Sequence, residues 1–155
     1  MKRILLILIV CFASSHSESA ERDFSVGAGV GILHSGLGIN LAYVGDTDLS
    51  YFSTGCDSYS TVAGITCGVG VGYVRTGLFG EKGKHGLGIN IGIVGTESKI
   101  VNGKKNNSAI YGGGISYIYF FNGISKAGLN LGVGGTISLE GNNDVNAAFQ
   151  IGYQF

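Results

Sequence analysis

The sequence predicts an all-β protein: a closed antiparallel transmembrane β-barrel of eight strands that follows a cleaved signal peptide. Three observations support this. Apolar and small residues alternate in segment after segment, as in strands with two different faces. The 155 residues include 29 Gly and no Pro, and only 13% are charged. A basic N-terminus runs directly into a short apolar stretch. The length allows one domain, and the zero net charge provides no basic field for nucleic acid.

The first 20 residues have the pattern of a secretory leader. Lys2 and Arg3 precede ten apolar residues at 4–13, whereas a membrane-spanning helix needs about 20. Small and polar residues follow, so we predict a signal peptide at 1–20 and a barrel domain at 21–155. Cleavage after Ala20 is favoured over cleavage after Ser17 or Ser19, and an uncleaved anchor is the alternative.

Period-two alternation defines the predicted strands. An eighth segment, at 48–54, is short and weakly patterned, so the alternative is seven strands with 46–60 as one loop. The seven clear segments are 24–33, 37–44, 63–73, 87–94, 111–121, 129–138 and 145–155.

The composition of the two faces decides which one points inward. A soluble barrel needs charged residues on its outer face, but the less apolar face here consists of Gly, Ser, Asn, Thr and Gln. Turning the apolar face toward lipid and the small residues toward the lumen matches a transmembrane barrel, whose closure removes free edges. Phe120 and Gln150 are the larger lumen residues. Closely approaching strands, a narrow water-filled passage and a gap for an acyl chain all remain open. The aromatic residues expected to form interfacial girdles, with ordinary sheet packing as the alternative, are Tyr43, Tyr73, Tyr119, Phe121, Tyr153 and Phe155.

The end of the chain carries the most specific signal. Phe149, Ile151, Tyr153 and Phe155 alternate with small or polar residues, and the chain stops on an aromatic ring. Together with the leader and the strand pattern, the region from Phe24 onward resembles the small outer-membrane β-barrels of Gram-negative bacteria, the OmpA/OmpX-like group. The resemblance implies that the barrel assembly machinery reads this last strand and that periplasmic chaperones accompany the chain. It also implies a monomer in contact with outer-membrane lipid and lipopolysaccharide.

With both termini in the periplasm, the outward turns are expected at 34–36, 55–60, 96–107 and 140–143. The segment 76–85 is then an unusually long periplasmic turn.

The topology also bears on Cys56 and Cys67. With Cys56 at a hairpin tip, Cys67 lies about six residues along the return strand, or roughly 20 Å away. A disulfide requires Cα atoms within about 7 Å. We therefore predict two free thiols, whereas a bond between them would indicate a folded-back loop.

No pattern of catalytic residues stands out, so we predict a non-enzymatic protein with a structural or surface-interaction role and no cofactor or metal. Lys99, Lys104 and Lys105 are candidate contacts for anionic lipid or glycan. One alternative is a narrow pore, although no ring of charges lines the lumen. The other is a lipid-modifying enzyme of the acyltransferase or deacylase type, for which His34 and Ser35 are the only tempting pair. The remaining candidates, which belong to no recognisable site, are Asp57, Glu81 and His85.

Overall fold

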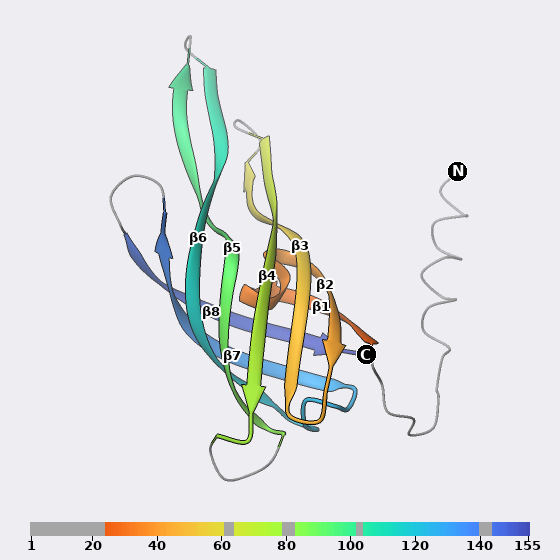
Figure 1. The fold of residues 1–155 in the computed structure, drawn as a ribbon. Coiled ribbons are helices and arrows are strands. Elements are labelled where there is room, and N and C mark those ends of the chain that lie inside the picture. The colour runs from red at the N-terminus through yellow and green to blue at the C-terminus, as the bar shows by residue number, and fades with distance from the viewer. Residues whose placement is uncertain (1–23, 61–63, 79–82, 102–103, 140–143) are drawn as a thin grey trace, which may run out of the picture.

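The computed structural model describes residues 24–60, 64–78, 83–101, 104–139 and 144–155. Eight antiparallel strands follow one another around a closed barrel (Figure 1), which confirms the predicted fold class and the count of eight. Within these residues no helix is long and apolar enough to cross a membrane. The elements are β1 (Phe24–Gly31), the 3-10 turn η1 (Ile32–His34), β2 (Gly36–Val44), β3 (Asp48–Ser60), β4 (Gly64–Thr76), β5 (His85–Val101), β6 (Lys104–Phe120), β7 (Gly128–Ser138) and β8 (Val145–Gln154).

The barrel closes where β8 pairs with β1. The register runs from Gly27 opposite Gln154 to Val30 opposite Ile151. The Phe155 amide then donates a 2.8 Å hydrogen bond to a carbonyl of β1. An even number of antiparallel strands brings the start of β1 and the end of β8 to the same end of the barrel. We call this the terminal end and the other the hairpin end.

The hairpin end is uneven because β5 and β6 are 17 residues long and project beyond the other strands (Figure 1). The predicted turn at 96–107 is therefore wrong: β5 continues to Val101 and β6 begins at Lys104. A bulge between Ile93 and Gly95 changes the register, after which the two strands pair again. Threonine, isoleucine and valine in this stretch favour extended backbone, which explains why the ladder outlasts the alternation of the sequence.

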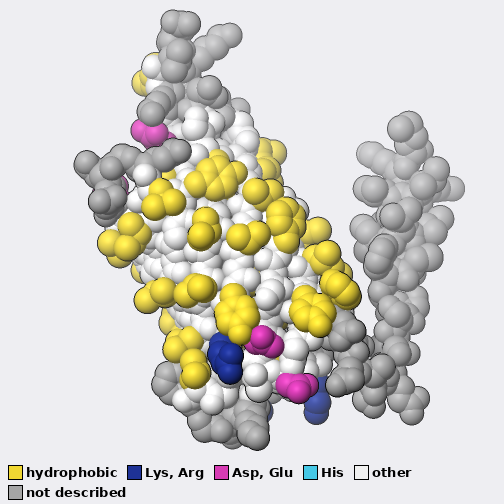
Figure 2. All heavy atoms as spheres, in the orientation of Figure 1, with side chains coloured by type: hydrophobic (Ala, Val, Ile, Leu, Met, Phe, Trp, Pro, Cys, Tyr) yellow, Lys and Arg dark blue, Asp and Glu magenta, His cyan; other side chains and the backbone are white. Residues whose placement is uncertain are grey.

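Burial confirms the predicted orientation of the two faces. In β2, Leu37, Ile39 and Leu41 are exposed, whereas Asn40 and Ala42 are buried. Among the described residues, 31 large apolar side chains are exposed and nine apolar side chains are buried. Figure 2 shows the apolar side chains spread over the middle of the barrel, with the charged ones toward its two ends. The barrel is thus apolar outside.

Candidate functional site

The turn between β1 and β2 folds into the lumen. Leu33 and His34 of η1 are completely buried. Ser35 then adopts a left-handed conformation with φ 54°, and Gly36 follows with φ 94°. The sequence correctly predicts a turn here but wrongly places it outside, because nothing local distinguishes an inward turn from an outward one.

Two facing glycines make room for this inward turn. Gly38 of β2 lies opposite Gly55 of β3, and a Cβ atom at either position would overlap the carbonyl oxygen of His34. A Cβ at Gly152 of β8 would likewise collide with the His34 ring. The glycines that line the lumen therefore have a structural purpose here, since they let the backbone of η1 approach the barrel wall closely.

Uncharged polar side chains in the lumen form two hydrogen-bonded groups, one of which includes η1. The Leu33 amide donates to Gln150 Oε1 at 2.9 Å, and Gln150 Nε2 donates to Asn130 Oδ1 at 2.8 Å. Gln154 Nε2 donates to Ser25 Oγ at 2.8 Å and to Asn40 Oδ1 at 3.1 Å. These bonds link β1, β2, β7, β8 and η1, and so they reinforce the short pairing at the closure.

The His34 ring is buried in the lumen but joins neither group. Neither ring nitrogen has a hydrogen-bond partner among the described residues. Burial lowers the pKa of this turn residue to about 4, so the ring is uncharged at neutral pH. Ser35 Oγ instead lies 2.7 Å from Ser53 Oγ. The tempting His34 and Ser35 pair thus forms no nucleophile–base contact in this structure.

Toward the terminal end, the lumen holds an apolar core. Phe120 and Gln150 are inside, as predicted. The size of the core was not predicted, because its members are scattered over several strands and each looks isolated in its own segment. The buried apolar residues of this core are Leu33, Ala42, Val44, Leu49, Tyr51, Val74, Ile118, Phe120 and Ile124.

The other candidate residues are dispersed. Asp57 of β3 accepts a 3.0 Å hydrogen bond from Thr96 Oγ1 of β5, and this pair is exposed. The ring of His85 forms a hydrogen bond with the Tyr117 hydroxyl on the outer face of β5 and β6. Glu81 lies outside the described residues, as do the predicted signal peptide at 1–20 and the turn at 140–143. Nowhere in the described parts of the chain do three His, Cys, Asp or Glu residues gather closely enough to hold a metal ion.

The three candidate lysines lie in the projecting hairpin. Lys99 is opposite Asn106, Lys104 opposite Val101, and Lys105 opposite Ile100. The structure describes the backbone of the three lysines but not their side chains. Their proposed contacts with anionic groups remain a prediction.

Cys56 and Cys67 form a disulfide, which corrects the prediction of two free thiols. The error arose from the expected turn at 55–60. In the structure β3 continues to Ser60, so Cys56 lies within the strand and directly opposite Cys67 rather than at the hairpin tip. Bond and hairpin therefore coexist, and no folded-back loop is needed.

We expect mature chain purified without reductant to resist thiol alkylation and to take up two labels per molecule after reduction and unfolding. Replacing both cysteines by serine should lower the free energy of unfolding by about 2–4 kcal/mol, because the bond restricts the unfolded chain. Mass spectrometry after alkylation and urea titration measure the two effects. Labelling of both thiols in the unreduced chain would contradict the pairing.

Aromatic rings gather at the terminal end of the exterior. Phe24 and Tyr43 lie 5.5 Å apart between ring centroids, Tyr119 and Phe121 5.1 Å, and Tyr153 and Phe155 4.9 Å. These three pairs involve β1, β2, β6, β8 and the residues directly after β6 and β8, and their role as an interfacial girdle stays a prediction. Four outward residues of the predicted assembly signal are exposed along β8, namely Phe149, Ile151, Tyr153 and Phe155.

The fold and its interior thus define a closed eight-stranded β-barrel with an apolar exterior and a filled lumen. No protein-family model matches this chain, and neither the curated proteins nor the solved structures contain a match.

Proposed function

We propose that this chain is an integral outer-membrane β-barrel of the OmpA/OmpX-like kind, without enzymatic activity. Its role would be structural or would involve surface interaction through the hairpins at the hairpin end. The observation that carries the proposal is the apolar exterior: 31 large apolar side chains are exposed among the described residues. Soluble monomers rarely expose contiguous apolar patches larger than a few hundred Å², so apolar side chains on every strand favour contact with lipid.

The closed hydrogen-bonded wall supports the same proposal. Lipid supplies no hydrogen bonds to backbone groups, and a closed barrel satisfies them internally. A tilted strand needs about 9–11 residues to span a bilayer. β5 and β6, with 17 residues each, have enough length to span it and to extend beyond it. The projecting hairpin that contains Lys99, Lys104 and Lys105 is the proposed contact for lipopolysaccharide or other anionic glycans.

The first test expresses the full chain in a Gram-negative host and separates the membranes from soluble protein. We expect the mature chain in the outer-membrane fraction, with different gel mobility before and after boiling, because closed barrels resist detergent until heated. A chain that stays in the aqueous fraction without detergent would overturn the proposal.

Introducing a charge on the apolar exterior tests the membrane location more sharply. Ile89 on β5 is 62% exposed, and Ile89→Arg should lower the free energy of unfolding in lipid vesicles by about 2–4 kcal/mol if it lies near the bilayer centre. The matched control is Ile65→Arg near the hairpin end of β4, where exposure is 65% and the expected cost is about 0–1 kcal/mol. Urea titration in vesicles measures both. Equal losses in the free energy of unfolding at the two positions would contradict a membrane-embedded exterior.

A further inference from the structure

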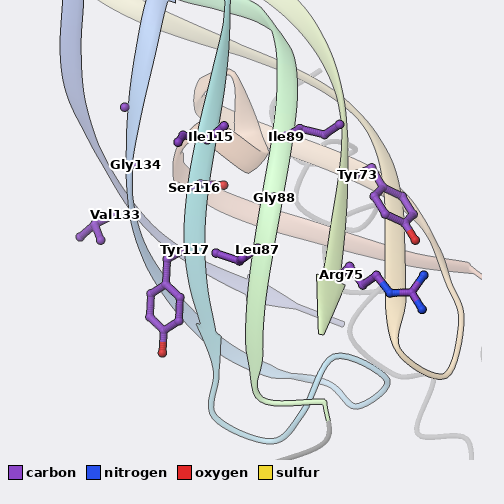
Figure 3. A pocket seen from close by; sticks show the side chains of 11 residues that line it. Tyr73, Arg75, Leu87, Gly88, Ile89, Ile115, Ser116, Tyr117, Val133 and Gly134 are labelled. Atoms are coloured by element: carbon purple, nitrogen blue, oxygen red, sulfur yellow. The ribbon is translucent and has the colours of Figure 1, made fainter. Parts of the chain in front are cut away.

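A groove runs across the outer face of the barrel over β4, β5, β6 and β7. Its volume is about 530 Å³. Most of its outward side chains are apolar, and in Figure 3 Tyr73 and Arg75 extend from β4 on one side while Tyr117 and Val133 extend on the other. The further apolar residues that line it are Leu87, Ile89 and Ile115.

An outward-facing glycine leaves the groove uncovered. Gly135 of β7 lies opposite Ile115 of β6, which is 69% exposed, so both positions face away from the lumen. A Cβ at Gly135 would meet only the Asn146 carbonyl oxygen, at 3.9 Å. The glycine is therefore not required by crowding inside the barrel, and any larger side chain would occupy the groove.

Opposite charges lie at the foot of the groove, near the terminal end. Arg75 of β4 is directly opposite Asp48 of β3, and both lie on the outer face. Asp48 Oδ2 accepts a 3.0 Å hydrogen bond from the Tyr73 hydroxyl. Arg75 is exposed, and within the described residues its guanidinium makes no hydrogen bond or ion pair. Its five donors are thus free to meet an anion from outside the described chain.

We propose that this groove binds one zwitterionic phospholipid from the leaflet at the terminal end. An acyl chain fills the apolar part, the phosphate binds Arg75, and the ammonium group of an ethanolamine headgroup lies near Asp48. Arg75 and the Tyr73–Asp48 hydrogen bond lie at the β4 side of the groove, and apolar residues extend from there over β5, β6 and β7, so a headgroup and an acyl chain would each meet groups of matching chemistry. Guanidinium recognises phosphate through paired, charge-assisted hydrogen bonds. This inference rests on the proposed membrane location.

The test uses native mass spectrometry of the folded mature chain in detergent, mixed in turn with dimyristoyl-phosphatidylethanolamine and dimyristoyl-phosphatidylglycerol. We expect one retained lipid per chain and a preference for the ethanolamine lipid. Arg75→Gln should weaken retention of both lipids by about tenfold, the loss of one charge-assisted contact. Asp48→Asn should weaken retention of the ethanolamine lipid only, and so remove the preference for it over the glycerol lipid.

Two glycine variants separate groove binding from general lipid contact. Gly135→Leu fills the groove and should abolish retention while the barrel still folds. Gly113→Leu is the matched control: it lies on the outer face of β6 outside the groove, and its Cβ would have only the Asn90 carbonyl oxygen nearby, at 3.5 Å. It should retain lipid as the wild type does.

The possible results distinguish a failure of the lipid site from a failure of the proposed function. The lipid site would be overturned if Arg75→Gln and Gly135→Leu both retained as much lipid as the wild type, in chains whose gel mobility still shifts on boiling. The membrane proposal would not be affected by that result. A preference for the glycerol lipid would overturn the role of Asp48 and the zwitterionic assignment. A wild-type chain that is soluble without detergent would overturn the proposed function itself.

Discussion

Replacing Gly38 by valine should prevent the barrel from closing around η1, with a loss of about 3 kcal/mol or more in the free energy of unfolding. The added Cβ would overlap the carbonyl oxygens of His34 and Thr54 and the Cα of Gly55. These are backbone atoms of the inward turn and of the paired strand, so no side-chain rotation relieves the overlap. Gel mobility before and after boiling, combined with urea titration, measures the loss of folded barrel.

The control for this change is Gly135→Val. That position also lies in a barrel strand, so the substitution adds the same side-chain volume and the same gain in strand propensity. Its Cβ would meet only one atom within 4 Å. We expect a folded chain with nearly unchanged stability. If Gly38→Val is as stable as Gly135→Val, the turn does not lie against the wall as the structure places it.

Truncating Phe120 to alanine should lower the free energy of unfolding by about 3–5 kcal/mol. Its ring is only 2% exposed, and it belongs to the apolar core that fills the lumen toward the terminal end. A cavity at this site cannot collapse easily because the surrounding wall is a closed hydrogen-bonded sheet. Urea titration in detergent micelles measures the change.

The neighbouring residue provides a matched comparison. Phe121 follows Phe120 directly but is 45% exposed and faces outward, where its ring lies 5.1 Å from that of Tyr119. Phe121→Ala should cost about 0.5–1.5 kcal/mol, the worth of one aromatic pair. Equal costs for the two phenylalanines, or a larger one for Phe121, would mean that inside and outside are exchanged at the end of β6.

The alternation of apolar and small residues was sufficient to predict seven of the eight strands and the two faces of the sheet. This information is local, because successive side chains of a strand point to opposite sides whatever the strand pairs with. The weakest segment, at 48–54, is a full strand that extends to Ser60. Its pattern was obscured because Leu49 and Tyr51 face inward as part of the core, and so reverse the usual order of small inside and apolar outside.

The candidate sites were much less predictable. The disulfide depends on the register between β3 and β4, and a shift of the turn by a few residues separates or unites Cys56 and Cys67. The groove depends on Gly135 lying beside residues of three other strands. Asp48 and Arg75, the opposite charges near the groove, are 27 positions apart in the sequence. None of these relations has a local signature.

Local sequence patterns therefore predict an all-β chain with one apolar and one small-residue face, because side-chain direction in a strand has a period of two. The folded barrel alone shows that η1 turns inward, that Cys56 meets Cys67 and that Arg75 lies opposite Asp48 beside an apolar groove. Those features depend on strand register and barrel closure, which bring together residues that are distant in the chain.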